Sequence, residues 1–207
     1  MFISFEGGEG SGKTTIIESL YQNLQAMGYK VLKTREPGGS RIAEEIRNVI
    51  LNVENLEMDP WTEALLYAAS RRQHTVEVIR PALEAGKIVL CDRYLDSSLA
   101  YQGVGRGLGI EEVWKINQYA TEGLLPDLTL YIDVKPEVGL SRIRHSERKL
   151  DRLDLEKEDF HDTVRTGYLK LAAMFPERIK VVNGNRTIEA IAAEIMDLII
   201  ERLRGTR

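Results

Sequence analysis

Hydrophobic residues gather in short runs along this chain, and the stretches between the runs carry apolar residues three and four positions apart. The short runs have the length and composition of strands, and they cover residues 2–5, 30–32, 88–91, 128–132 and 179–182. We expect all five strands to be buried on both faces.

The stretches between these runs are predicted to be helices. Two of them show the helical spacing clearly, with apolar residues at Ile16, Leu20 and Leu24 and at Ile188, Ile191, Ile195 and Leu198. Strands that alternate with helices predict an α/β fold with a parallel sheet covered on both sides, and ligands of such folds bind beyond the carboxyl ends of the strands. We therefore expect the chemistry at the strand-to-loop junctions.

Two segments fit the alternation poorly. Residues 36–58 contain a glycine turn followed by a charged helix, and residues 142–159 are crowded with charges of both signs. We expect both segments to be mobile covers.

The composition is that of one folded domain covering residues 1–207, with 43% hydrophobic and 29% charged residues. No apolar run approaches the roughly 20 residues that a membrane helix needs, and residues 1–5 lack the basic start of a signal peptide. We expect a cytoplasmic protein that does not bind membranes. The formal net charge of −4 argues against a protein that coats nucleic acid.

Neither the single cysteine nor His145 shows a pattern typical of catalysis or metal binding. Cys91 cannot form an internal disulfide, and we interpret it as a small core residue because no paired histidine context is evident. His145 has no metal-ligand spacing and is given no role.

A glycine-rich loop links the first predicted strand to the first predicted helix. Its sequence, GGEGSGKT at residues 7–14, matches the pattern G-x-x-x-x-G-K-[ST] in the context that this pattern requires. Its backbone N–H groups can surround phosphate oxygens, Lys13 can reach the β- and γ-phosphates, and the Thr14 hydroxyl suits Mg²⁺. The predicted ATP-binding residues are Gly7, Gly8, Glu9, Gly10, Ser11, Gly12, Lys13, Thr14 and Thr15.

This loop predicts a P-loop NTPase fold, a three-layer sandwich in which a five-stranded parallel sheet lies between helices. The alternative is a glycine turn that only caps a helix, which the full lysine-and-threonine pattern disfavours. The loop indicates nucleotide binding, but it does not by itself distinguish a kinase from a switch protein or an ATPase.

Three further motifs follow in order: TREPGG at residues 34–39, DRY with two following serines at residues 92–98, and AYQG at residues 100–103. With the glycine-rich loop they resemble bacterial thymidylate kinase, over almost the whole chain from Phe2 to at least Asp154. The resemblance implies an enzyme that transfers the γ-phosphate of ATP to dTMP, giving dTDP and ADP in dTTP synthesis, with Mg²⁺ as cofactor. It also implies a homodimer, formed through helices between residues 63–83 and 113–124.

Arginines and one aromatic ring are candidates for the acceptor site, which the resemblance places at about residues 36–72. A guanidinium fork suits phosphate or a base carbonyl, and the alternative for each arginine is a surface salt bridge. The resemblance assigns Arg47 and Arg93 to the acceptor monophosphate and Arg71 to thymine, and it leaves Arg72 as structural. Tyr67 lies one helical turn before Arg71, where the family usually has a phenylalanine stacked on the base; a core aromatic is the alternative.

An amide at Gln102 offers both a donor and an acceptor, which suits N3–H and O4 of thymine. From the residues alone Gln102 would be a loop residue. The resemblance instead places Gln102 and Ser98 at the pyrimidine edge, and Glu36 beside the acceptor.

Asp92, at the carboxyl end of a predicted strand, is the best candidate to hold Mg²⁺ together with Thr14, directly or through water. The alternative for Asp92 is a helix N-cap.

The transition state of phosphoryl transfer calls for a mobile positive charge. Some thymidylate kinases carry an arginine inside the P-loop, but residues 8–11 contain none. Residues 142–154 resemble the lid of the variety that places its arginines there, so Arg148 and Arg152 are predicted to be catalytic along with Lys13 and Arg93, and Arg144 is held in reserve. A solvated helix face is the alternative for this charged stretch.

Three other functions remain open at this point. Another pyrimidine nucleoside monophosphate kinase would share the loop and the lid, although the TREPGG and DRY motifs argue against it. A P-loop switch module would bind ATP without transfer to an acceptor, and a structural protein with an accidental P-loop would leave the junction at Asp92 and Arg93 unexplained.

Overall fold

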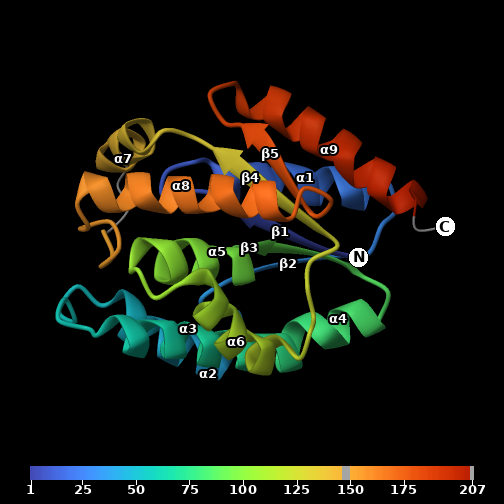
Figure 1. The fold of residues 1–207 in the computed structure, drawn as a ribbon. Coiled ribbons are helices and arrows are strands. Elements are labelled where there is room, and N and C mark those ends of the chain that lie inside the picture. The colour runs from blue at the N-terminus through green and yellow to red at the C-terminus, as the bar shows by residue number, and fades with distance from the viewer. Residues whose placement is uncertain (146–149, 206–207) are drawn as a thin grey trace.

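The computed structural model describes residues 1–145 and 150–205, and it confirms the α/β fold with a five-stranded parallel sheet. The strands lie in the order β2-β3-β1-β4-β5, between two layers of helices (Figure 1). The strands are β1 (Phe2–Glu6), β2 (Val31–Arg35), β3 (Ile88–Asp92), β4 (Leu128–Asp133) and β5 (Ile179–Asn183).

Helices follow every strand, as the three- and four-residue spacing predicts. They are α1 (Lys13–Ala26), α2 (Arg41–Leu51), α3 (Pro60–His74), α4 (Arg80–Glu84), α5 (Leu95–Ser98), α6 (Ile110–Thr121), α7 (Pro136–Arg144), α8 (Glu158–Met174) and α9 (Ile188–Gly205), with the π-helical turns η1 (Thr75–Ile79) and η2 (Leu99–Gly105). No helix in the described ranges is both long and apolar enough to cross a membrane.

The prediction that all five strands are buried on both faces is wrong for β2 and β5. These two strands are the edges of the sheet, so each has only one neighbouring strand. Several of their side chains reach solvent, among them Lys33, Arg35 and Val181. Charged side chains on an edge strand also discourage pairing with a second sheet.

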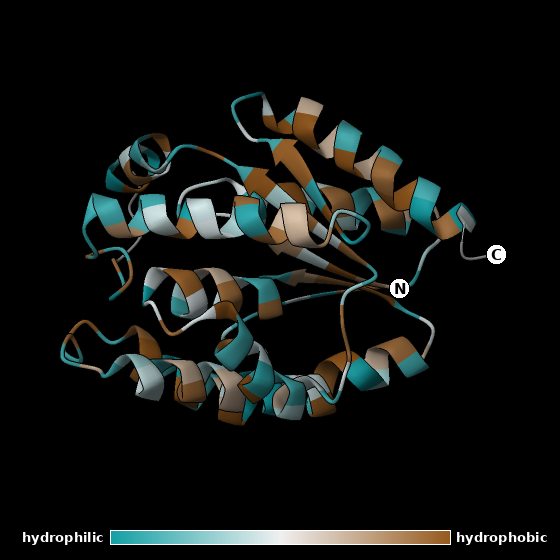
Figure 2. Ribbon diagram, in the orientation of Figure 1, coloured by the Kyte–Doolittle hydropathy of each residue, from teal (hydrophilic) through white to brown (hydrophobic). Residues whose placement is uncertain are grey.

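Each face of the sheet has its own hydrophobic core. One core joins α1 and α9 to the sheet through residues such as Ile16 and Ile195. The other lies under α3, α5, α6, η2 and α8, and it contains Tyr94, Tyr168 and Cys91, which is buried and unpaired as predicted. Figure 2 shows the strands as largely hydrophobic and the helices as alternating between polar and apolar faces, as expected for elements that bury one side.

The register of the central strands brings the two main motifs together. Phe5 in β1 is paired with Asp92 in β3, and the Arg93 N–H donates to the Phe5 carbonyl at 2.9 Å. Arg93 adopts a left-handed φ of 69°, which is uncommon outside glycine and turns the chain sharply at the end of β3. The glycine-rich loop after β1 and the DRY turn after β3 therefore lie side by side.

Candidate active site

One large cavity lies at the carboxyl ends of the strands. Its volume is about 620 Å³, which suits two small ligands in contact. It is bounded by the loops after β1, β2 and β3, by α3 and η2, and by the end of α7. The predicted site residues that line it are Glu9, Gly10, Ser11, Gly12, Lys13, Thr14, Thr15, Glu36, Arg47, Tyr67, Asp92, Arg93 and Gln102.

The glycine-rich loop is curled around the Lys13 ammonium. Lys13 Nζ donates to the carbonyl oxygens of Gly7 (3.1 Å) and Gly8 (3.0 Å) and to Ser11 Oγ (3.1 Å). Burial lowers the pKa of Lys13 to about 8. A bound triphosphate would replace these neutral acceptors with anionic oxygens. Its negative charge would raise the pKa of Lys13 again and keep the ammonium protonated.

Gly10 holds the loop against α7. Its φ is 66°, and an added Cβ would lie 2.1 Å from the carbonyl oxygen of Gly139. Only glycine fits such a position without moving one of the two backbones. The loop is therefore fixed by a contact with a helix that lies far along the chain.

Thr14 and Asp92 meet as the sequence predicts. Thr14 Oγ1 donates to Asp92 Oδ2 at 3.0 Å, and both residues line the cavity. The described residues contain no group of three or more His, Cys, Asp or Glu side chains that could hold a metal ion. One hydroxyl and one carboxylate fit Mg²⁺ better than metals that need a full protein cage, because Mg²⁺ keeps water and phosphate ligands.

Arg93 is the best anchored cation of the site. Nη1 donates to the Gly7 carbonyl (2.9 Å) and contacts Ser97 Oγ (3.3 Å) and Tyr168 OH (3.2 Å), while Nη2 donates to the Glu9 carboxylate (2.6 Å). Burial opposes its charge, but Glu9 together with Tyr101, Tyr168 and Asp92 outweighs burial and raises the pKa of Arg93 above its ordinary value. Arg93 is therefore a fixed positive charge between the P-loop and the rest of the cavity.

Glu36 belongs to the TREPGG loop, and Arg47 in α2 contacts the same loop. Arg47 Nη1 donates to the Pro37 carbonyl at 2.8 Å, and burial lowers the pKa of Arg47. The Glu36 carboxylate accepts from Arg71 Nε (2.8 Å) and contacts His74 Nδ1 (3.1 Å). Glu36 therefore links the loop after β2 to α3, while Arg47 presents its remaining donors to the cavity.

Arg71 lies behind the cavity wall. Its side chain is buried, and four of its five N–H groups are accounted for by bonds to Glu36, Ser98 (3.0 Å), Asn117 and the Tyr94 carbonyl (2.9 Å). Neither Arg71 nor Ser98 is among the residues that line the cavity. The second N–H of Nη2 makes none of these four bonds, and Ser98 acts here as a partner of Arg71.

Tyr67 and Gln102 form the wall farthest from the P-loop sequence. Both are buried except for the part that lines the cavity. Burial raises the pKa of Tyr67 above its ordinary value, so its hydroxyl stays neutral. A neutral aromatic ring beside an amide is typical of a site for a planar base.

The predicted lid arginines differ in their surroundings. Arg148 lies outside the described residues. Arg152 does not line the cavity; it is buried, with Nε donating to the Ile50 carbonyl (2.8 Å) and Nη2 to the Glu63 carboxylate (2.5 Å). Arg144, held in reserve, is exposed. Neither Arg144 nor Arg152 lines the cavity.

Nine further residues of the described chain line the cavity without having been selected as site residues from the sequence, and among them are the polar residues Arg35, Tyr101, Arg142 and Asp151. Arg142 Nη1 donates to the Gly10 carbonyl (3.2 Å), and the Tyr101 hydroxyl donates to Glu9 (3.0 Å). Arg35 and Tyr101 belong to the TREPGG and AYQG motifs, so the motifs could have identified them. Arg142 is the first residue of the predicted lid segment, but its contact with the P-loop is seen only in the structure.

Comparison with known proteins identifies relatives over the whole chain. The family model described as "Thymidylate kinase" matches residues 5–195. The chain is 58% identical to a thymidylate kinase of Geobacillus thermodenitrificans, covering 100% of this chain and 92% of the relative. It is 56% identical to one of Acholeplasma laidlawii, covering 98% of this chain and 100% of the relative. A crystal structure of thymidylate kinase from Ehrlichia chaffeensis superposes with a TM-score of 0.80 at 32% identity, covering 96% of this chain and 98% of that one.

Proposed function

This chain belongs to the thymidylate kinase family and phosphorylates dTMP to dTDP, and we propose that it does so by holding ATP and dTMP at opposite ends of the cavity described above. The observation that carries this proposal is that the P-loop and the wall formed by Tyr67 and Gln102 line one continuous space. Two bound nucleotides in one space can align an acceptor oxygen with a γ-phosphate, and alignment is most of what phosphoryl transfer requires.

The donor end is the P-loop. The backbone amides of residues 7–14 and the start of α1 would hold the ATP phosphates, with Lys13 moving from carbonyl acceptors to phosphate oxygens. Thr14 and Asp92 would hold Mg²⁺, which when bound neutralises charge on the donor phosphates.

The acceptor end is formed by α3, η2 and the loop after β2. Arg93 and Arg47 supply donors for the dTMP monophosphate, Tyr67 supplies a ring for the thymine, and Gln102 with the remaining donor of Arg71 reads the base edge. Glu36 and Ser98 act through Arg71, since both are bonded to it. The acceptor would thus meet its charged end at Arg93, next to the P-loop.

The source of the transition-state charge stays a prediction. Arg148 and Arg152 remain the proposed lid residues, and Arg152 would have to leave Glu63 to reach the phosphates. Arg142 already lies at the P-loop through its bond to Gly10. A segment that brings arginine to the phosphates only when both nucleotides are present would limit hydrolysis of ATP by water.

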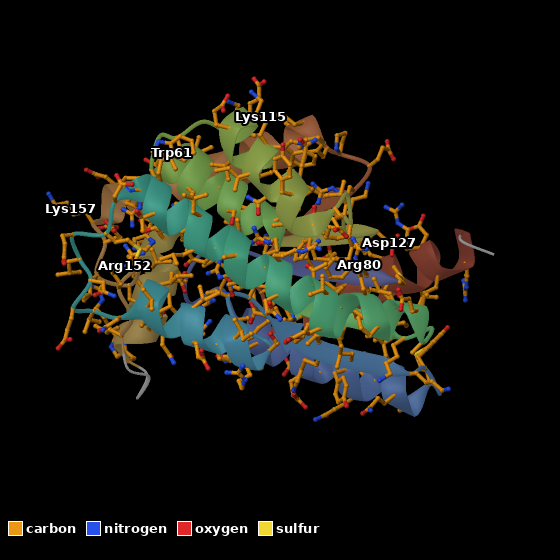
Figure 3. All side chains as sticks on the ribbon, turned by 90° about the horizontal axis from the view of Figure 1, so that it is seen from below. Trp61, Arg80, Lys115, Asp127, Arg152 and Lys157 are labelled. Atoms are coloured by element: carbon orange, nitrogen blue, oxygen red, sulfur yellow. The ribbon has the colours of Figure 1, made fainter. Side chains whose placement is uncertain are left out.

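The helical layer of α2, α3 and α6 is proposed to form a homodimer. It exposes large apolar side chains, among them Val49 (47%), Leu65 (54%) and Tyr119 (85%). Figure 3 looks onto this layer, with Trp61 at its margin. Apolar patches of this kind mark association surfaces. Light scattering on the purified protein is expected to give twice the chain mass, and a concentration-independent monomer would contradict the dimer.

A cytoplasmic location is also proposed. The chain's single cysteine is buried and free, which needs no oxidising compartment. Imaging of the tagged protein in cells would test the location, and a signal confined to the envelope would contradict it.

The acceptor preference is tested by coupled measurement of ADP formation with ATP and Mg²⁺, adding dTMP and then UMP. We expect strong stimulation by dTMP alone, because the chain belongs to the thymidylate kinase family. Stimulation by UMP in place of dTMP would keep the kinase and reject the assigned acceptor end. No stimulation by any monophosphate would favour the switch module.

A further inference from the structure

Glu63 is a buried carboxylate that neither the motifs nor the mechanism above uses. It lies in the first turns of α3, one turn before Tyr67 and two before Arg71, so all three side chains share one face of the helix. Its exposed fraction is 0%, whereas Trp61 and Leu65 on the opposite face are open to solvent. A carboxylate buried this completely needs partners for both oxygens.

Three side chains supply those partners. Gln102 Nε2 donates to Glu63 Oε1 at 2.8 Å. Arg106 Nε donates to Oε1 (3.2 Å) and Arg106 Nη2 to Oε2 (3.0 Å), while Arg152 Nη2 donates to Oε2 (2.5 Å). Burial acts to raise the pKa of Glu63, but the hydrogen bonds and charges of these partners, Arg106 first, outweigh it and hold the pKa below its usual range. Glu63 is therefore ionised, and an ionised carboxylate only accepts hydrogen bonds.

This contact decides which way the Gln102 amide is turned. Because Glu63 cannot donate, Gln102 must point its NH₂ group at Glu63, and its carbonyl oxygen Oε1 takes the other direction. No residue in the described ranges donates a hydrogen bond to this Oε1, and it is not among the buried polar atoms that lack a partner. The atom therefore reaches open space, which at Gln102 is the cavity.

We propose that Glu63 is a positioning residue that fixes the Gln102 amide with its oxygen toward the cavity, so that the site accepts a pyrimidine with a protonated N3 and rejects one with a 4-amino group. The inference rests on the proposed acceptor end. Thymine and uracil present N3–H, which donates to an amide oxygen, and O4, which accepts from Arg71. Cytosine presents a lone pair at N3 and an amino group at C4. Its N3 would therefore place an acceptor against the Gln102 oxygen, and its amino group would place a donor against the Arg71 donor.

The test compares kcat/KM for dTMP, dUMP and dCMP in the wild type and in Glu63→Gln. A glutamine at 63 can offer either its oxygen or its NH₂, so the Gln102 amide becomes free to turn. We expect the ratio of kcat/KM for dTMP over dCMP to fall about 10- to 100-fold. The ratio for dTMP over dUMP is expected to stay unchanged, because both bases have the same N3 and O4 edge.

Arg106→Met is the matched control. It removes the larger of the ion pairs from the same buried carboxylate but leaves the contact between Glu63 and Gln102. We expect this variant to lose stability in thermal unfolding and to keep the wild-type ratio for dTMP over dCMP. A fall of that ratio equal to the one in Glu63→Gln would mean that general loosening of the cluster, and not the amide, sets selectivity, which would overturn the proposal.

A second set of variants keeps the proposal testable if the Glu63→Gln protein folds poorly. Gln102→Leu removes the amide with little change in size, and it is expected to lower the dTMP over dCMP ratio as well. Adding Glu63→Gln to Gln102→Leu should then change the ratio no further, because Glu63 acts through Gln102. An unchanged ratio of kcat/KM for dTMP over dCMP in folded Glu63→Gln or in Gln102→Leu would reject the inference about Glu63. The proposed acceptor end would still be supported if the wild type phosphorylates dTMP. If the wild type failed to use dTMP, the acceptor assignment itself would fail first.

Discussion

Replacing Lys13 with alanine is expected to lower kcat about 10²- to 10³-fold, which is the cost of removing one preorganised donor from a developing oxyanion. Lys13 is buried within the P-loop and reaches three oxygens in the absence of phosphate, so its ammonium is already in place when the triphosphate arrives. Steady-state kinetics with saturating ATP and dTMP measures the effect.

The control for this prediction is the affinity for dTMP, measured by titration calorimetry without ATP. Lys13 belongs to the donor end, so the Kd for dTMP should change less than about threefold while kcat falls by orders of magnitude. Loss of dTMP binding in a folded Lys13→Ala protein would contradict the division of the cavity into a donor end and an acceptor end.

Replacing Arg93 with alanine is expected to lower kcat/KM for dTMP about 10²- to 10³-fold. The substitution removes the charge proposed to hold the acceptor monophosphate, and it leaves the Glu9 carboxylate without its strongest partner. An anionic phosphate would then meet a carboxylate that has lost the neighbouring charge of Arg93, which adds repulsion to the lost attraction.

Arg93→Lys is the informative companion to that variant. Lysine keeps the charge, but its donors lie on one nitrogen, whereas Arg93 uses two separate nitrogens to reach Gly7 and Glu9. We expect kcat/KM for dTMP in Arg93→Lys to exceed that of Arg93→Ala by less than about tenfold. Recovery to wild-type activity would mean that Arg93 supplies only charge, and unchanged activity in Arg93→Ala would remove it from the site altogether. Thermal unfolding of both variants separates these effects from loss of the fold.

The elements that the sequence predicts well are those that depend on local pattern. The runs at residues 2–5 and 88–91 become central strands because they are apolar except for Ser4, and the spacing of Ile16, Leu20 and Leu24 gives α1. The P-loop motif is recognised from an equally local pattern, its glycines and the helix that it precedes, although its contact with Gly139 in α7 is a tertiary one. For that reason the contact between Thr14 and Asp92 could be expected before the structure was known.

Features that depend on tertiary contacts could not be predicted in the same way. A run of residues does not show whether its strand will lie at the centre or the edge of a sheet, which is why β2 was wrongly expected to be buried. Nothing near Arg71 or Arg152 in the sequence shows that both will be held by buried carboxylates from other elements. The same holds for Glu63, whose role depends on helix α3 facing η2.

The most direct test of the account is a crystal structure with dTMP, Mg²⁺ and a non-hydrolysable ATP analogue bound together. The account predicts the analogue's phosphates within residues 7–14, the dTMP monophosphate at Arg93, and the thymine against Tyr67 with its N3 within hydrogen-bond distance of Gln102 Oε1. A dTMP base bound away from Tyr67 and Gln102, or a monophosphate out of reach of Arg93, would contradict it.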